Sequence, residues 1–181
     1  MRLVFMVEER SMEELLKEIL PKILPEDVEF LIIPHNGKSD LAASIQKKLR
    51  AWNYPGDKFV IVHDQDSNDC ILLKSKLSEL CGCGRNEFLI RIVCRELEAW
   101  YFGDLNALSL AYGKNLKTLS GKRKYREPDG IGNPKQEIYK LLPMYQQISG
   151  AKQIGQYMNS ESNTSHSFNV FVEGVKRLCA T

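Results

Sequence analysis

Four short apolar runs punctuate the first half of the chain. They are Arg2–Val7, Val28–Ile33, Lys58–His63 and Phe88–Cys94. Short, nearly continuous apolar runs are typical of strands that are buried on both faces of a parallel sheet. We therefore predict four β-strands.

The segments after the first three runs carry apolar residues at helical spacing. These residues are Leu15, Leu16, Ile19 and Leu20, then Leu41, Ala42, Ile45 and Leu49, then Ile71, Leu72, Leu77 and Leu80. Ser11 and Glu14 have the spacing of a capping box, Ser39 can cap the second helix, and Gly82 can end the third. Strands that alternate with helices form right-handed βαβ units, so we expect an α/β fold with a mostly parallel four-stranded sheet and helices on both faces.

The rest of the chain shows no comparable strand pattern. Helices are expected around residues 95–102, 104–112, 134–142 and 167–179, with a polar loop at 120–133. We interpret residues 1–112 as an α/β core and residues 113–181 as a basic loop and helical extension packed on that core, in one compact domain.

The composition is typical of a folded cytoplasmic protein. Hydrophobic residues make up 43% of the 181 residues and charged residues 27%, which excludes the composition of disordered chains. The five cysteines are odd in number, and no apolar stretch has the length of a signal-peptide core or a membrane span. We expect a reducing cytoplasm and no membrane partner.

Charge is unevenly distributed along the chain. The net charge is +2, but residues 113–126 hold six basic residues and no acid, while the preceding segment has an excess of acids. The basic residues of the loop are Lys122, Arg123, Lys124 and Arg126. Such a run is either a solvated charged surface or an element that contacts phosphate groups.

Ionisable residues follow all four predicted strands, and acids dominate among them. Glu8 follows the first, Asp64 and Asp66 the third, and Glu96 and Glu98 the fourth. Ligands of open α/β sheets bind beyond the carboxyl ends of the strands, and carboxylate oxygens are the ligands that Mg²⁺ and Mn²⁺ prefer. Since clustered carboxylates repel one another without a cation, we predict a divalent-metal site at this edge.

Each of these residues also has a simpler interpretation. The segment Asp66–Asp69 can be a turn followed by a helix N-cap, and an acid after the first strand can interact with the following helix dipole. Only one of Glu96 and Glu98 is expected to face the site. Lys38, after the second strand, and Lys135, at a helix start, can neutralise a phosphate.

Glu8 after the first strand and Asp64-Gln65-Asp66 after the third resemble the metal-binding motif of TOPRIM domains. These are Rossmann-like modules of topoisomerases, bacterial primases and overcoming-lysogenization-defect (OLD) nucleases. The ordered set His35–Leu41, Asp64–Cys70, Arg95–Trp100 and Asn133–Lys135 further resembles the bacterial domain-of-unknown-function family DUF4276. Many TOPRIM domains have glycine after the first glutamate, whereas Glu9 stands here.

The resemblance implies a TOPRIM-like fold and metal-dependent phosphoryl transfer on nucleic acid, with DNA favoured over RNA. Asp64 and Asp66 would hold Mg²⁺ or Mn²⁺, and Glu8 would act as a ligand or general acid–base. Glu96 or Glu98 would bind a second ion, and Lys135 or the basic loop would contact phosphate. Because such relatives are often encoded beside ATPases in phage-defence loci, the resemblance also implies an ATPase partner.

Two other functions remain open at this point. A receiver-like signalling domain also places acids after its first strand and an aspartate after its third, but it needs a lysine after a fifth parallel strand. No such strand is evident in the sequence. A non-catalytic module could instead use its C-terminal helices to dock a partner. The sequence does not decide the oligomeric state.

Overall fold

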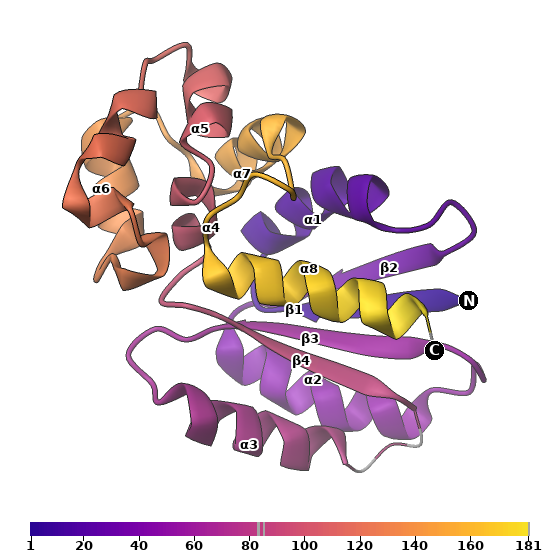
Figure 1. Cartoon of the computed structure of the whole chain (residues 1–181). Coiled ribbons are helices and arrows are strands. Elements are labelled where there is room, and N and C mark those ends of the chain that lie inside the picture. The colour runs from indigo at the N-terminus through magenta and orange to yellow at the C-terminus, as the bar shows by residue number, and fades with distance from the viewer. Residues whose placement is uncertain (83, 85, 181) are drawn as a thin grey trace.

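A sheet of four parallel strands forms the centre of the molecule in the computed structural model, which describes residues 1–82, 84 and 86–180 (Figure 1). The strands are β1 (Arg2–Val7), β2 (Glu29–Pro34), β3 (Lys58–Asp64) and β4 (Phe88–Val93). Their order is β2-β1-β3-β4, and each neighbouring pair is parallel. The predicted α/β fold with a parallel four-stranded sheet is confirmed.

Eight α-helices accompany this sheet in the described part of the chain. They are α1 (Arg10–Ile23), α2 (Lys38–Ala51), α3 (Cys70–Cys81), α4 (Glu98–Phe102), α5 (Leu105–Tyr112), α6 (Pro134–Leu141), α7 (Gln147–Tyr157) and α8 (His166–Cys179). Short 3-10 helices lie at Lys117–Gly121, Arg123–Tyr125 and Pro128–Gly130. The sequence pattern predicts neither α7 nor the 3-10 turns within the segment interpreted as a loop. No described helix is long and apolar enough to cross a membrane.

The two faces of the sheet are covered by different helices. Along β1, Leu3, Phe5 and Val7 belong to one core with α1 and α8, while Val4 and Met6 belong to a second core with α2 and α3 (Figure 1). All five side chains are fully buried. The strand is apolar throughout because both of its faces are covered.

Helices α4 to α7 form a layer beside α1, away from the sheet (Figure 1). Helix α7 packs along α1, where an added Cβ on Gly155 would lie 2.9 Å from the Cβ of Glu18. The Lys22 ammonium, near the end of α1, donates to the carbonyl oxygens of Gly155 and Gln156 at 2.7 and 2.8 Å. The two helices therefore end side by side and run in the same direction.

Three predicted helix starts are wrong. Helix α1 begins at Arg10 without a side-chain cap, and Glu14 pairs with Lys17 in place of completing a capping box with Ser11. Helix α2 begins at Lys38, so Gly37 is its N-cap and Ser39 lies inside the first turn. The helix predicted around 95–102 begins at Glu98, because Arg95 adopts a left-handed turn.

The connections after β1 and β3 leave on opposite faces of the sheet. Strand β1 leads into α1, in one core, and its neighbour β3 leads into α3, in the other. In open α/β sheets, this divergence opens a crevice at the carboxyl ends of the two strands. Glu8 and Asp64 lie at these ends.

Candidate metal centre

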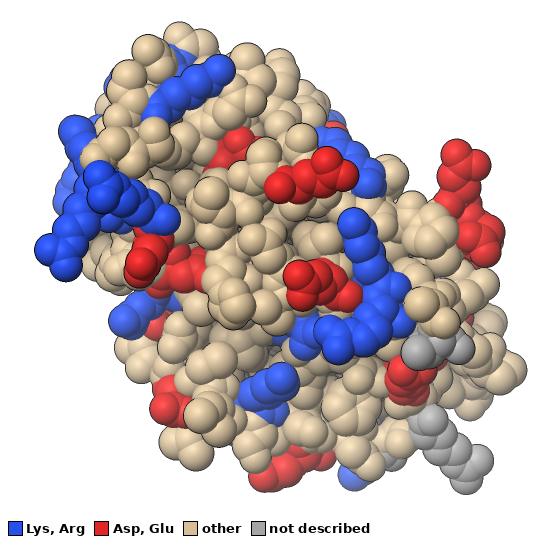
Figure 2. Space-filling model, viewed as in Figure 1, with Lys and Arg blue, Asp and Glu red and all other residues tan. Residues whose placement is uncertain are grey.

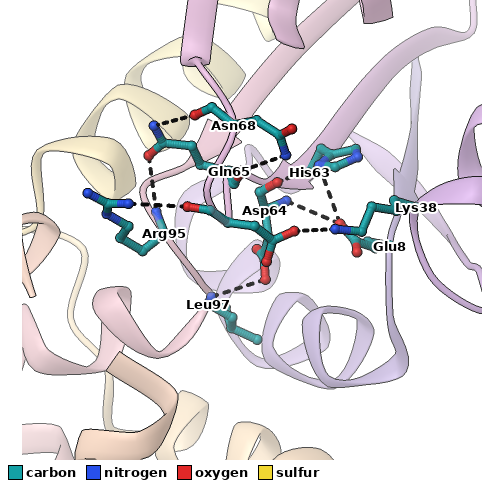
Figure 3. A network of polar contacts seen from close by, with 9 residues as sticks. Glu8, Lys38, His63, Asp64, Gln65, Asn68, Arg95 and Leu97 are labelled. Carbon is teal, nitrogen blue, oxygen red and sulfur yellow. Dashed lines mark hydrogen bonds and ion pairs between the residues drawn. The ribbon is translucent and has the colours of Figure 1, made fainter. Parts of the chain in front are cut away.

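The Glu8 carboxylate lies against the end of β3. Its Oε2 is 3.4 Å from the backbone nitrogen of Asp64 and 3.3 Å from Nδ1 of His63, and the side chain is 12% exposed (Figure 3). Burial raises the pKa of the Glu8 carboxyl, and the Asp66 charge adds to this rise, while His63 opposes it. A carboxyl group with a raised pKa, at a crevice, is the type of group that handles protons in active sites.

Asp64 is the last residue of β3 and stands at the centre of the acidic cluster. Its Oδ2 accepts a hydrogen bond of 3.3 Å from the backbone nitrogen of Leu97, in the turn after β4 (Figure 3). Burial raises the pKa of the Asp64 carboxyl well above its ordinary value, and the charges of Glu8 and Glu98 raise it further. Its neighbours therefore disfavour a negative charge at this position.

Asp66 lies in a left-handed backbone turn with a φ of 52°, and Arg95 in the adjacent turn has a φ of 61°. The Asp66 nitrogen donates to the carbonyl of Arg95 at 2.7 Å, which joins the two turns. The Asp66 carboxylate pairs with the Lys38 ammonium at 2.6 Å. Unfavourable backbone at non-glycine residues is retained where surrounding contacts stabilise it, and such residues cluster at functional sites.

The residues between Asp66 and α3 shape this turn. Gln65 and Asn68 exchange side-chain to backbone hydrogen bonds of 3.0 and 2.9 Å (Figure 3). Asp69 caps α3, since its Oδ1 accepts from the nitrogens of Ile71 and Leu72 at 2.9 Å. The simpler interpretation of the Asp66–Asp69 segment thus holds for Asp69, whereas the Asp66 carboxylate pairs with Lys38 and caps nothing.

Glu96 and Glu98 have different surroundings. Glu98 is 2% exposed and accepts a hydrogen bond of 2.9 Å from the Tyr145 hydroxyl, and burial raises its pKa. Its charge contributes to the raised pKa of Asp64, so it lies on the buried side of the cluster. Glu96 accepts from the backbone nitrogen of Lys135 at 3.1 Å and so occupies the amino end of α6.

The basic loop lies on the α6 side of the helical layer, where Figure 2 shows basic side chains gathered beside acidic ones. Lys122, Arg123, Lys124 and Arg126 are all exposed. Lys124 pairs with Glu137 at 2.5 Å, and Arg126 donates to the carbonyl of Gly121. Lys135 is only partly exposed, and its charge acts on Glu98. Of the predicted phosphate-contacting residues, Lys38 has a direct contact with the acidic cluster.

Several residues of this network carry no clear signal in the sequence. His63 and Leu97 contact Glu8 and Asp64, and both are adjacent in sequence to predicted ligands. Tyr145 reaches Glu98 across 47 positions, and Tyr101, buried close by, has a hydroxyl group with no hydrogen-bond partner among the described residues. Trp100, Tyr101 and Phe102 are buried in the core, as predicted.

The donor chemistry of the cluster fits a divalent metal ion. Its members are carboxylate oxygens, the charges of Glu8, Glu98 and Asp66 add to the raised pKa of Asp64, and Lys38 supplies a positive charge beside Asp66. In the described residues no three His, Cys, Asp or Glu side chains converge closely enough to form a complete metal site. Binding a metal would therefore require rotation of these side chains, with water as the remaining ligands, as Mg²⁺ often has.

The comparison with protein families decides the identity of the chain. The sequence profile of the family described as "Domain of unknown function (DUF4276)" matches residues 7–176, which is nearly the whole chain. The chain belongs to the DUF4276 family. No curated protein matches this DUF4276 chain.

Among solved structures, the C-terminal region of the Burkholderia pseudomallei OLD protein has the same fold as this DUF4276 protein. The TM-score is 0.62 at 12% sequence identity, and the match covers 98% of each chain. The fold is therefore TOPRIM-like, as the motif resemblance predicted. At this level of identity the similarity concerns the fold alone.

Proposed function

We propose that this protein is a divalent-metal-dependent nuclease of the TOPRIM type that hydrolyses phosphodiester bonds in nucleic acid, with DNA favoured over RNA. One observation carries the proposal: the Glu8 carboxylate lies 3.4 Å from the Asp64 nitrogen at the carboxyl ends of β1 and β3, where the connections diverge, and Lys38 pairs with Asp66 two residues further on. The similarity in fold to the C-terminal region of an OLD protein supports it.

Asp64, Asp66 and Glu8 are the proposed ligands of Mg²⁺ or Mn²⁺. A bound cation would polarise the phosphate group and lower the pKa of water. Glu98 is the better placed of the two remaining acids for a second ion, because its charge acts on Asp64, whereas Glu96 is held at the amino end of α6.

The protein's own side chains have distinct proposed roles. Glu8, with its raised pKa, holds or accepts a proton, and the His63 ring, at 3.3 Å, orients the Glu8 carboxylate. Lys38, 56% exposed beside Asp66, is free to turn toward a phosphate oxygen. Lys135 and the basic loop would contact the nucleic-acid backbone on the α6 side.

The test uses supercoiled plasmid, linear duplex, single-stranded DNA and RNA, each with Mg²⁺, Mn²⁺ or EDTA. Asp64→Asn and Glu8→Gln should each lower metal-dependent cleavage by about 10²-fold or more, since each removes a group that acts on the reacting phosphate. Asp69→Asn is the matched control, because asparagine also caps helices and the variant loses a charge close to the cluster. Cleavage that persists in Asp64→Asn would contradict the proposal.

A non-catalytic module that docks an ATPase partner is the second candidate. Ile71 and Leu72, on the first turn of α3 beside the cluster, are 79% and 72% exposed. If no substrate is cut but calorimetry shows Mg²⁺ binding that requires Asp64, this candidate is favoured. Phosphorylation of Asp64 by a small phosphodonor would instead support a receiver-like function. A role in phage defence, in the cytoplasm, belongs with the nuclease proposal.

A further inference from the structure

A pocket lies beside the turn that follows Glu8. It has a volume of about 340 Å³ and is lined by Glu9–Ser11, His35–Gly37, Gln147 and Ile148. These residues belong to the first turns of α1 and α7 and to the segment that leads into α2. The amino ends of three helices, from distant parts of the chain, therefore meet at one pocket.

None of these three helices has a side-chain cap. The first backbone N–H groups of a helix have no partner within the helix, and its amino end carries a partial positive charge. Helices α1 and α7 run in the same direction, so their positive ends add, while Lys22 already satisfies the carboxyl end of α7. An anion in the pocket would satisfy the opposite end.

The charged side chains of the pocket leave room for an anion. Arg10 and Glu9 are both exposed, and their opposite charges leave the pocket with no net charge from this pair. The acids in the first turns of α1 and α2 are already engaged, since Glu13 pairs with Lys17 and Asp40 accepts from the Asn36 nitrogen. The first turn of α7 contains no acid.

His35 gives an independent indication of a ligand. Its ring lines the pocket and is 6% exposed, and its Nδ1 lies 2.9 Å from the carbonyl of Val7. Nδ1 must donate to this carbonyl, yet Nε2 has no hydrogen-bond partner within the described part of the chain. A buried polar atom without a partner is costly. Because Nδ1 carries the proton of the neutral ring, Nε2 is an acceptor and needs a donor, which a phosphate monoester or inorganic phosphate that keeps one proton supplies through its hydroxyl group.

We infer that this pocket binds a phosphate monoester group, either at the end of a nucleic-acid strand or on a small phosphorylated molecule. Helix amino ends bind phosphate through backbone N–H groups, and here three of them converge. The Gly37 nitrogen donates to the carbonyl of Glu8 at 3.0 Å, so the pocket and the acidic cluster share one turn. The pocket requires neither the metal ion nor cleavage.

The test measures inorganic phosphate binding to the full chain by ³¹P NMR in EDTA. Gln147→Glu places a carboxylate at the first position of α7, where it occupies the anion's place and interacts favourably with the helix dipole. We expect phosphate binding to weaken about tenfold or more, while the melting temperature in phosphate-free buffer rises. The rise would show that the variant is folded.

Gln136→Glu is the matched control. It makes the same change on an exposed side chain in the first turn of α6, whose amino end Glu96 already occupies. Phosphate binding should be unchanged in this variant and in Asp64→Asn. Absence of binding in the natural sequence, equal loss in both glutamine variants, or loss in Asp64→Asn would each overturn the inference.

Labelled single strands with a 5′-phosphate or a 5′-hydroxyl identify the source of the phosphate. If Gln147→Glu weakens binding of the 5′-phosphorylated strand alone, the pocket binds a terminal phosphate. Equal weakening for both strands would show that the pocket binds backbone phosphodiesters and would overturn the role given to His35. If Gln147→Glu weakens neither while inorganic phosphate binding is lost, the ligand is a small phosphorylated molecule. These experiments measure binding and not cleavage. Failure of the phosphate pocket can therefore be told apart from failure of the proposed nuclease activity.

Discussion

Lys38 has two possible partners in the proposed reaction, the Asp66 carboxylate and a phosphate group. Its ammonium is 2.6 Å from Asp66, but the side chain is 56% exposed. Exposed ion pairs contribute only about 0–1 kcal/mol to stability, so little is lost when Lys38 turns away. The residue is thus suited to exchange one anionic partner for another.

Replacing Lys38 should distinguish its effect on the Asp66 carboxylate from its contact with a phosphate group. In Lys38→Met, Mg²⁺ should bind up to about fivefold more tightly, because a competing cation leaves Asp66. Binding of duplex DNA should become less salt-dependent, with the slope of log K against log salt reduced by about 0.9, the value for one phosphate contact. Calorimetry and salt titrations measure both effects. Lys47→Met, on an exposed position of the same helix, is the control and should change neither.

Tyr145 should be needed for stability because it donates to a buried carboxyl group. Tyr145→Phe leaves Glu98, 2% exposed, without this hydrogen bond, which should cost about 1–3 kcal/mol. For a chain of this size, the melting temperature should fall by about 2–4 °C for each kcal/mol. Tyr139→Phe removes a hydroxyl from a side chain that is 41% exposed and should change stability by less than about 0.5 kcal/mol. Equal losses would show that the Glu98 contact is unimportant.

At the scale of elements, the backbone at the start of α2 positions Lys38. Gly37 is the N-cap of α2 and has a φ of 91° and a ψ of 176°, a conformation nearly restricted to glycine. A Cβ at this position would meet no atom within 4 Å, so any cost of substitution comes from the backbone.

Gly37→Ala should therefore destabilise the protein by about 1–3 kcal/mol and also shift Lys38 and the edge of the phosphate pocket. Gly56→Ala is the matched control: its φ is 88°, a Cβ would also meet nothing, and it lies at the opposite end of the sheet. Both variants should lose stability in urea denaturation. Only Gly37→Ala should weaken phosphate binding and Lys38-dependent DNA binding, and equal effects of the two would contradict the assignment.

The elements that the sequence predicts are those with a strong local pattern. The strands are continuous apolar runs, and α8 repeats Phe168, Phe171 and Val175 at helical spacing. Helix α7 has no such signal, because Gly150 and Gly155 replace side chains at its closest contacts. An added Cβ at Gly150 would lie 2.6 Å from the Tyr145 ring. The reason for these glycines lies in tertiary packing, which the local sequence does not contain.

The candidate site is predictable to a similar extent. Parallel topology places the residues after β1 and β3 side by side, so the proximity of Glu8 and Asp64 follows from the order of the elements. Which acid faces inward does not follow, since Glu96 and Glu98 differ only through their contacts with Lys135 and Tyr145. Those contacts come from the helical layer.

At the scale of the whole molecule, two layers enclose the acidic cluster. The sheet supplies Glu8 and Asp64, while the helical layer supplies Tyr145, which holds Glu98 behind them. Burial raises the pKa of all three carboxyl groups, and for Asp64 the neighbouring charges add to the rise. Keeping these carboxyl groups together therefore lowers the stability of the folded protein. A bound cation would restore part of that stability.

The pH dependence of stability follows from these shifts. Carboxyl groups with a raised pKa bind more protons in the folded than in the unfolded chain, so the stability that they contribute is present below their unfolded values of 3.8 and 4.5. It is lost as the pH rises through the higher folded values. Without metal, the natural protein should thus lose stability relative to a Glu8→Gln/Asp64→Asn variant as the pH rises from about 4 through the higher folded values. The comparison with this variant cancels the opposite contributions of other carboxyl groups.

Mg²⁺ should reverse this trend, because it binds the ionised carboxylates. At about 100 times its dissociation constant, a ligand of the folded state adds about 2.7 kcal/mol, or about 5–10 °C in melting temperature for this size. The increase should grow with pH over the same window and be absent in the double variant. Calorimetric scans in EDTA and in Mg²⁺ at several pH values measure it. An equal increase at pH 4 and pH 8 would mean that the ion binds elsewhere, since protonated carboxyl groups are poor ligands.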